Sequence, residues 1–347
     1  MRVAIDATPL TLSSGGLARY TSELTQALSA QFPEDEYTLV SPVGQVPDLP
    51  GSAGRRPAPF WWLWGVQREM NRNRTTLFHG TNFEVPYLPI RPSVMSLHDL
   101  SPWMDRTWHH AANRVRTRTP ALIQLGIATM IITDSESVRR QAITHFRIHP
   151  DRIVAVPLAP SAKFKPTTGQ VGDPPHFLYV GTLEPRKNIP LLLEAWRPVR
   201  DKHRIELHLA GRRREDFPAL PDEPGLRILG EVSDADLPAL YSQALALVYP
   251  SLYEGFGLPV LEAMQCGACV ITSTDPAIAE VIGDAGPRLD PRDPRAWTEA
   301  LLACAHGGDW LDQRRTQSLT RARQFSWERT ARMTREVYSE AHRRWHA

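Results

Sequence analysis

The segment YEGFGLPVLEAM, residues 253 to 264, combines glycines, a proline and two carboxylates in an order that suits a phosphorylated ligand. Gly255 and Gly257 carry no side chain, so they allow the backbone of a loop to approach a ligand closely. Pro259 fits the first position of a following helix, where its missing N–H would be unpaired anyway. The backbone N–H groups of residues 256–258 would then face an anion, because a helix N-terminus carries partial positive charge.

Two glutamates flank this loop. Glu254 precedes the glycines and could accept hydrogen bonds from the hydroxyls of a sugar ring. Glu262, which we expect in the first turn of the helix, could accept hydrogen bonds from two adjacent hydroxyls, as on a ribose. A carboxylate, a set of amides and a second carboxylate match a diphosphate that lies between two hydroxyl-rich rings.

The segment GTLEPRKNIP, residues 181 to 190, supplies positive charge. Arg186 offers a two-pronged guanidinium for phosphate oxygens and Lys187 a compact charge, just before a helix expected to begin near Asn188. Departure of a nucleoside diphosphate requires its growing negative charge to be stabilised by a divalent metal or by fixed cations. No Asp-x-Asp pair falls at the end of a predicted strand, so the sequence favours the cations and predicts no metal and no other cofactor. The simpler alternative is a solvated pair of cations in a surface loop.

Short apolar runs alternate with longer amphipathic segments along the chain. Such alternation predicts an α/β protein, in which helices cover both faces of a parallel sheet. Residues Leu17–Gln31, for example, have apolar side chains at helical spacing. Buried strands are predicted at Val3–Ile5, Tyr37–Val40, Leu77–Phe78, Val94–Leu97, Met130–Ile132, Phe177–Val180, Ile205–Leu209, Ala246–Tyr249 and Val270–Thr272.

The alternating pattern restarts after a polar, Gly- and Pro-rich stretch from Thr167 to Pro175, which is typical of an interdomain linker. A chain of 347 residues is too long for one ordinary core. We therefore predict two doubly wound domains, residues 1–166 and 167–325. The tail, Ser326–Trp345, is predicted to form a long basic helix with Ser326 as its N-cap.

Several glycines and polar residues lie in loops that follow predicted strands. In an open parallel sheet, the loops at the carboxyl ends of the strands form the ligand crevice. Gly15, Gly16 and His98 occupy such loops in the first half, and Gly181 and Thr182 in the second. Two crevices of this kind, facing each other, would form one interdomain cleft. Taken alone, His98 would more often be a structural histidine than a functional one.

The composition describes a folded protein without an evident polyanionic partner. The formal net charge of +2 is nearly neutral, so no global field favours nucleic acid. Three cysteines cannot form a disulfide framework, and the CxxC pair Cys266 and Cys269 lacks further zinc ligands, which indicates small buried thiols. The chain shows neither a signal-peptide pattern nor an apolar stretch as long as a membrane span. We expect a cytoplasmic protein with at most a peripheral membrane contact.

Two features keep a membrane contact open as a hypothesis. Trp61-Trp-Leu-Trp64 could be an aromatic anchor at a membrane surface, or it could line an acceptor site, although core packing is the simpler interpretation. Arg114, Arg116 and Arg118 alternate along a basic segment that could meet anionic lipid or a lipid-linked diphosphate. A solvated helix face is the default for such a segment.

Together, the two charged motifs resemble the signature of glycosyltransferase family 4, whose members are retaining enzymes with the GT-B fold. The hallmark of that family is two glutamates separated by seven residues, here Glu254 and Glu262. The resemblance extends over nearly the whole chain, through GG at 15–16, HD at 98–99, ITDSES at 132–137 and FSWE at 325–328. The string FLYVGTLEPRKN, residues 177–188, is especially similar to the mannosyltransferase branch of the family.

The resemblance implies a fold and a set of roles. It implies two Rossmann-like domains that face each other across a cleft, with the helix of residues 326–347 crossing back onto the first domain. The catalytic residues would be His98, Arg186, Lys187 and Glu254, with the two cations holding the diphosphate. The substrate-binding residues would be Gly15, Gly16, Gly181, Thr182, Arg186, Lys187, Val232, Glu254, Phe256, Gly257, Leu258 and Glu262.

The resemblance also implies the reaction. A hexose would pass from a nucleotide-diphosphate sugar to a glycan or lipid-linked acceptor of polysaccharide biosynthesis, with retained anomeric configuration. GDP-mannose is the favoured donor, and a UDP-hexose or dTDP-rhamnose are alternatives. A non-catalytic nucleotide-sugar-binding protein and a GT-B sugar-nucleotide epimerase are the alternatives to a transferase. One departure from the family pattern is Thr274-Asp275-Pro276, which stands where members often have Gly- or Asn-rich sequence.

Overall fold

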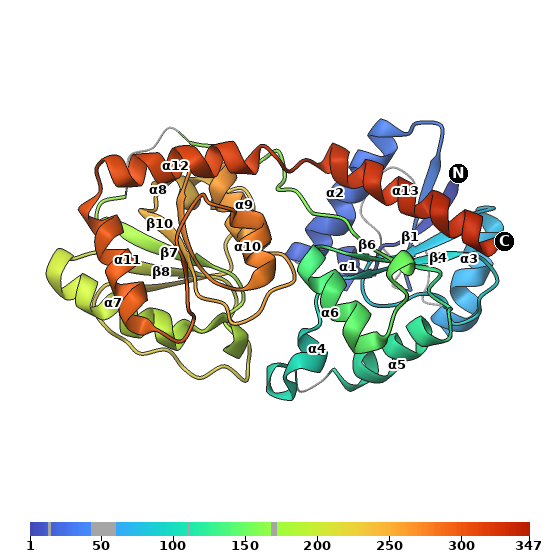
Figure 1. Ribbon diagram of the computed structural model, residues 1–347, viewed down its shortest axis with the longest axis horizontal. Coiled ribbons are helices and arrows are strands. Elements are labelled where there is room, and N and C mark those ends of the chain that lie inside the picture. Colours follow the sequence, from blue (N-terminus) through green and yellow to red (C-terminus); the bar gives the residue numbers. More distant parts are fainter. Residues whose placement is uncertain (13–14, 43–59, 110–111, 168–171) are drawn as a thin grey trace. The chain divides into compact units, whose positions relative to one another are not determined.

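The computed structural model describes residues 1–12, 15–42, 60–109, 112–167 and 172–347. Within these ranges the chain forms two compact units, and Figure 1 shows each of them as a sheet with helices packed around it. Unit 1 comprises Met1–Ala159 and Ser326–Ala347, and unit 2 comprises Pro160–Phe325. Part of the predicted linker, residues 168–171, lies outside the described ranges.

The described part of unit 1 contains a six-stranded parallel sheet in the order β2-β1-β3-β4-β5-β6. Its central strands are fully buried because helices pack on both faces, which explains their uninterrupted apolar runs. The strands are β1 (Arg2–Asp6), β2 (Glu36–Val40), β3 (Leu77–Gly80), β4 (Ser93–Leu97), β5 (Met130–Thr133) and β6 (Ile153–Ala155).

The C-terminal helix α13 (Trp327–Trp345) belongs to unit 1, where it packs against α2 (Gly16–Gln31) and contacts β4 and β5 (Figure 1). The hydroxyl of Ser326 accepts a hydrogen bond from the Arg329 N–H at 3.2 Å, which confirms the predicted N-cap. The other helical segments of unit 1 are α1 (Thr8–Leu12), η1 (Trp61–Gly65), α3 (Val66–Arg72), α4 (Ser101–Met104), η2 (Arg106–Trp108), α5 (Asn113–Gln124), α6 (Glu136–Phe146) and η3 (Pro150–Arg152).

Unit 2 contains, within its described residues, a second six-stranded parallel sheet in the order β12-β11-β10-β7-β8-β9. From the β9 edge the strands run third, second, first, fourth, fifth and sixth in chain order, which is the Rossmann arrangement. They are β7 (His176–Val180), β8 (Glu206–Ala210), β9 (Leu226–Gly230), β10 (Ala246–Tyr249), β11 (Cys269–Ser273) and β12 (Arg288–Leu289). The helical segments are η4 (Pro185–Lys187), α7 (Ile189–His203), α8 (Leu237–Gln243), α9 (Leu258–Gln265), α10 (Pro276–Ile282), α11 (Pro294–His306) and α12 (Asp309–Ala322).

The boundary between the units lies at Ala159 and Pro160, seven residues before the position predicted from the linker composition. Residues 160–166 belong to unit 2 because side chains of that unit contact them. The side chain of Gln265 donates hydrogen bonds to the carbonyl oxygens of Ser161 and Phe164, and the Phe164 ring packs 6.0 Å from that of Tyr241. Composition alone marked the polar stretch but not these contacts.

The predictions for the Trp and Arg segments are only partly right. Trp61 is buried, as core packing requires, but the side chain of Trp64 is 61% exposed. Arg116 donates hydrogen bonds to the carbonyl oxygens of Pro102 and His109, and Arg118 forms an ion pair with Glu84 at 2.6 Å. These two arginines therefore stabilise unit 1 rather than form a basic face.

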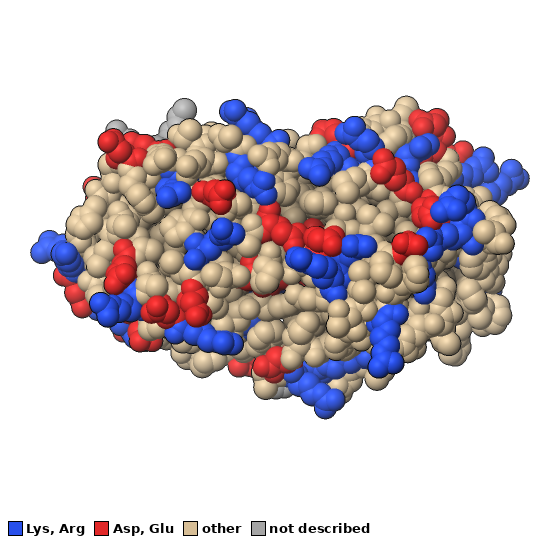
Figure 2. Space-filling model, viewed as in Figure 1, with Lys and Arg blue, Asp and Glu red and all other residues tan. Residues whose placement is uncertain are grey.

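Cationic and anionic side chains alternate over the surface that Figure 2 shows. This mixture agrees with the near-neutral net charge of +2. The thiols of Cys266, Cys269 and Cys304 are free and buried, as expected for small packing residues.

Candidate functional site

The loops after β7 and β10 meet where the strand order of unit 2 reverses. The two strands are paired neighbours, with Ala246 opposite Phe177 and Leu247 opposite Leu178. Ligands of open α/β sheets bind beyond the carboxyl ends of the strands at such a reversal. The first loop carries Arg186 and Lys187, and the second carries Glu254, so the topology brings together motifs that are far apart in sequence.

Arg186, Lys187 and Glu254 form one charged cluster. The Nη1 of Arg186 donates hydrogen bonds to Glu254 Oε2 and to the Tyr253 carbonyl oxygen, both at 3.0 Å. The Nζ of Lys187 donates to Glu254 Oε1 and, at 2.8 Å, to the hydroxyl oxygen of Tyr249. Lys187 and Glu254 are both buried. The Glu254 carboxylate is thus shared by both cations.

The carboxylate of Glu254 stays ionised around neutral pH. Burial alone would raise the pKa of Glu254, but Lys187 and Arg186 outweigh it and lower that pKa to about 2. Burial and the charge of Arg186 lower the pKa of Lys187, and Glu254 opposes this shift. Glu254 is therefore an anion at any pH near neutrality.

Two further charged residues, Glu184 and Arg214, extend the cluster: Glu184 forms ion pairs with both Arg186 and Arg214. Buried Glu184 places one carboxylate oxygen 2.7 Å from the Nε of Arg186 and the other 3.0 Å from the Nη1 of Arg214. Sequence analysis did not identify either role. The signal that could have found Glu184 is its place inside the GTLEPRKN motif, whereas nothing local marks Arg214.

Helix α9 begins at Leu258, one residue earlier than the position of Pro259 suggested. Glu262 therefore lies in the second turn of the helix, and the expectation that it occupies the first turn was wrong. Its side chain is buried, and Oε2 accepts a hydrogen bond at 3.0 Å from the hydroxyl of Tyr241. Tyr241, on α8, is a partner that sequence analysis did not identify.

The backbone of the EGFG loop needs glycine at one position. Gly257 has φ = 98°, in the left-handed region, and a Cβ there would come 3.3 Å from the Ile278 side chain. Phe256 and Leu258, on either side, are buried. The structure therefore holds the three predicted amides in a tight turn at the start of α9, as the sequence suggested.

The remaining predicted residues of unit 2 lie in three strand-end loops. Gly181 follows β7 at φ = 149°, and its N–H donates to the Ala210 carbonyl oxygen at 2.9 Å. The Thr182 carbonyl oxygen accepts a hydrogen bond from the Tyr179 hydroxyl at 3.1 Å. Val232 follows the edge strand β9, which β8 separates from β7. Gly181 and Thr182 thus adjoin the charged cluster, whereas Val232 does not lie at the strand reversal.

In unit 1, His98 follows β4 and is fixed by two acceptors. Its Nδ1 lies 2.8 Å from Asp134 Oδ2 and its Nε2 lies 2.7 Å from the Thr81 carbonyl oxygen. Burial alone would lower the pKa of His98, but Asp134 and the Thr81 carbonyl raise it above its usual value. Both ring nitrogens lie beside acceptors, which favours the protonated imidazole and leaves His98 badly placed to accept a proton. Its predicted contact with the reacting sugar stays a prediction.

Gly15 and Gly16 are exposed at the start of α2. Gly15 has φ = 95°, and, apart from its chain neighbours, no described residue comes within 4 Å of the position that a Cβ would occupy there. In the same region Asp6 ends β1, and its carboxylate accepts hydrogen bonds from the Thr8 N–H and hydroxyl. Burial raises the pKa of Asp6 to about 6, although these hydrogen bonds oppose the shift.

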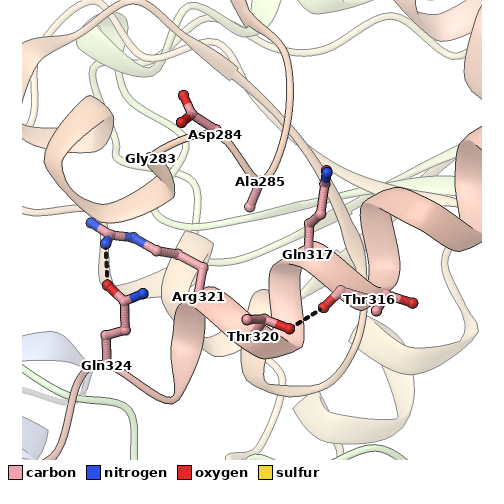
Figure 3. A pocket seen from close by; sticks show the side chains of 8 residues that line it. All are labelled: Gly283, Asp284, Ala285, Thr316, Gln317, Thr320, Arg321 and Gln324. Carbon is pink, nitrogen blue, oxygen red and sulfur yellow. Dashed lines mark hydrogen bonds between the residues drawn. The ribbon is translucent and has the colours of Figure 1, made fainter.

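A separate depression of about 340 Å³ lies between α12 and the loop after α10, which Figure 3 shows. Its cation, Arg321, donates to the carbonyl oxygens of Val281 and Glu280 and to the Gln324 side chain. The guanidinium is thus committed to the end of α10, and the depression contains none of the predicted site residues.

The described residues offer neither a metal-binding group nor a membrane-spanning helix. No group of three or more His, Cys, Asp or Glu side chains there is arranged to hold a metal ion. Of the helices in those ranges, none is both long and apolar enough to cross a membrane.

Comparisons with known proteins agree with this architecture. Residues 14–159 match the family model described as Glycosyltransferase Family 4, and residues 174–306 match the one described as Glycosyl transferases group 1. O-antigen chain mannosyltransferase B of Escherichia coli is 31% identical over 97% of this chain and 99% of its own length.

Solved structures share the fold at low sequence identity. Sucrose-phosphate synthase from Thermosynechococcus elongatus superimposes with a TM-score of 0.75 at 17% identity, covering 98% of both chains. Anabaena Alr3699/HepE, solved in complex with UDP-glucose, gives a TM-score of 0.77 at 14% identity, over 98% of this chain and all of that one.

The chain belongs to glycosyltransferase family 4. It is accordingly a glycosyltransferase, and the expected GT-B class of fold is confirmed by its two parallel-sheet units and its structural neighbours. The two non-transferase alternatives considered from the sequence are thereby set aside. The donor, the acceptor and the stereochemistry are matters for the proposal below.

Proposed function

We propose that this glycosyltransferase transfers mannose from GDP-mannose to a glycan or lipid-linked acceptor, with retained configuration and without a metal ion. The observation that carries the proposal is the cluster of Arg186, Lys187 and Glu254 at the strand reversal of unit 2. Mannose is supported by the GTLEPRKN string and by the name of the Escherichia coli relative, which is a mannosyltransferase. That name also supports an acceptor of the O-antigen chain type, which is a glycan.

In this proposal the diphosphate takes the place of the Glu254 carboxylate as the partner of the two cations. Arg186 has planar, forked N–H groups that suit two phosphate oxygens, and Glu184 anchors its Nε. Glu254, released from the cations, accepts hydrogen bonds from hydroxyls of the donor sugar. Glu262 and the amides of residues 256–258 hold the ribose and the sugar phosphate respectively.

The reaction then needs no enzymic nucleophile. The bond between the anomeric carbon and the β-phosphate oxygen breaks, and the acceptor oxygen bonds to that carbon on the same face. The proton of the acceptor hydroxyl passes to the departing phosphate oxygen. Fixed cations stabilise the charge that develops on this phosphate, and such preorganised electrostatic stabilisation is usually the largest contribution to catalysis.

Unit 1 is proposed to supply the acceptor side. Gly15 and Gly16 leave open space at the start of α2, which permits a close approach of substrate. His98 adds a fixed positive charge at the end of β4, next to its buried partner Asp134. In this role His98 orients the reacting groups electrostatically and transfers no proton.

A peripheral contact with the cytoplasmic face of a membrane belongs to the same proposal. The side chains of Phe60, Trp64 and Ile90 are 74%, 61% and 52% exposed, and Arg68, four residues after Trp64, is exposed on α3. Aromatic rings with nearby cations suit an anionic interface. We expect Trp64→Ser to reduce co-sedimentation with phosphatidylglycerol vesicles relative to the wild type. No binding by the wild type would remove this part of the proposal.

The direct test is to incubate the protein, without metal, with GDP-mannose and separately with UDP-glucose and dTDP-rhamnose. The proposal predicts slow hydrolysis of GDP-mannose alone and faster release of GDP with a mannan oligosaccharide acceptor. The anomeric configuration of the product, measured by NMR, should match that of the donor. Turnover of another donor would correct the sugar assignment, and inversion would contradict the mechanism.

A further inference from the structure

Asp275 stands at the departure from the family pattern and connects two elements of unit 2. Its Oδ1 accepts hydrogen bonds from the N–H groups of Ala277 and Ile278, at 2.9 and 3.0 Å, and so caps α10. Its Oδ2 accepts a hydrogen bond at 3.2 Å from the backbone N–H of Glu254. One buried carboxylate therefore joins the start of α10 to the first residue of the EGFG loop.

The same two elements also touch through their atoms. Gly257 lies against Ile278, because a Cβ at Gly257 would stand 3.3 Å from an Ile278 side-chain carbon and 3.9 Å from its Cα. Before this contact, the hydroxyl of Ser273 donates to the Ser251 carbonyl oxygen at 2.6 Å. The EGFG loop thus packs against the N-terminus of α10, and the carboxylate of Asp275 joins the two by hydrogen bonds.

We propose that Asp275 is a positioning residue, which sets the orientation of Glu254 and of the amides of residues 256–258 toward the donor diphosphate. The inference rests on the proposed function only for the identity of the ligand, since the contacts themselves lie within unit 2. Asp275 touches neither donor nor acceptor in this account. Its effect passes through the Glu254 backbone, whose N–H would otherwise be buried without a partner.

The two oxygens of Asp275 have separate tasks, which allows a sharp substitution. In Asp275→Asn the remaining oxygen can still cap α10, because Asn is as good an N-cap as Asp. The new NH₂ group, however, cannot accept from the Glu254 N–H and would face it. Asp293 is the matched control, because its Oδ1 caps α11 through Arg295 and Ala296 while no EGFG residue is among its partners at that cap.

The first measurement is hydrogen exchange of the full chain without ligand, which does not depend on the donor. We expect amide exchange in residues 254–258 to be about tenfold faster in Asp275→Asn than in the wild type, equivalent to about 1.4 kcal/mol. Asp293→Asn should leave that segment unchanged. Equal exchange in the two variants would overturn the proposal. If Asp275→Asn does not fold, Asp275→Ser is the second variant, because its hydroxyl caps the helix but is too short to reach Glu254.

The second measurement is steady-state kinetics with GDP-mannose. We expect Asp275→Asn to raise the KM for the donor about tenfold while changing kcat less than about threefold, because ground-state binding is affected more than chemistry. A fall in kcat with unchanged KM would contradict a positioning role. If the wild type does not turn over GDP-mannose, the donor assignment fails, and hydrogen exchange still decides the role of Asp275.

Discussion

The strand-end loops of the two units differ in their charge. In unit 2, the cations Arg186 and Lys187 share the Glu254 carboxylate. In unit 1, the cation His98 is enclosed by Asp134 and a carbonyl oxygen, and Asp6 has a pKa raised to about 6. The two sheets have similar topology, so the fold alone does not set this difference.

Two parallel sheets of the same class thus carry strand-end loops that suit different ligands. Cations that share one carboxylate, as Arg186 and Lys187 share Glu254, can exchange it for a diphosphate. A histidine whose two nitrogens are already engaged by protein acceptors has no ring N–H left for a phosphate. We therefore assign the leaving phosphate to unit 2 and the acceptor hydroxyl to unit 1.

The largest expected effect is that of Lys187. Lys187→Met should lower kcat by about 100-fold or more, since removal of one preorganised stabilising group typically has this size. The apolar chain of Met fills the space of the Lys stem, although Glu254 then loses one of the two cations that share it, which will also lower the stability of unit 2. Lys202→Met, at an exposed position near the end of α7, is the control and should behave as wild type. Normal turnover of Lys187→Met would remove the cation from the mechanism.

A smaller effect is expected at His98. His98→Gln should lower kcat by roughly tenfold, because only a fixed charge is lost and each 1.4 kcal/mol changes the rate tenfold. The stabilisation of the protein by a nucleoside diphosphate should not change, since that ligand is assigned to unit 2. His149→Gln, on an exposed side chain, serves as the control. Loss of nucleotide binding in His98→Gln would contradict the assignment of the nucleotide to unit 2.

The third prediction concerns stability, which should change with pH in opposite directions for Asp6 and Glu254. The pKa of Asp6 is raised to about 6 by burial, so its stabilising contribution is present below pH 3.8 and is lost as pH rises through 6. The pKa of Glu254 is lowered to about 2 despite burial, by Lys187 and Arg186, so its contribution is present above pH 4.5 and is lost as pH falls toward 2.

Two variants isolate these slopes. The free energy of unfolding of Asp6→Asn, minus that of the wild type, should increase as pH rises from 4 to 6. The same difference for Glu254→Gln should increase as pH falls below 4. Each change is at most about 3 kcal/mol, since one pKa unit corresponds to about 1.4 kcal/mol. Urea unfolding at several pH values measures both, and slopes of the same sign would contradict the comparison.

The central strands of both sheets could be predicted from the sequence because helices bury them on both faces. All nine predicted strands are confirmed to within a residue or two at each end. The three that were missed, Ile153–Ala155, Leu226–Gly230 and Arg288–Leu289, are edge strands. Edge strands are short or partly exposed, so they lack the continuous apolar run that marks a buried strand.

The charged residues of the candidate site could be predicted, but their partners could not. Local motifs marked Arg186, Lys187 and Glu254, because residue type and strand-end position are visible in the sequence. The contacts of Glu184 with Arg214 and of Asp275 with Glu254 arise only when separate loops fold together. The double engagement of His98 likewise depends on Thr81 and Asp134, which lie on neighbouring strand ends.

The most direct test of the central claim is thermal unfolding of the protein with GDP, UDP, dTDP and ADP, without metal and then with magnesium. A ligand that binds only the folded state must raise the apparent stability. The account predicts a clear increase in melting temperature with GDP that magnesium does not alter and that Lys187→Met abolishes. No increase with any diphosphate, or an increase that requires magnesium, would contradict a cationic, metal-independent donor site.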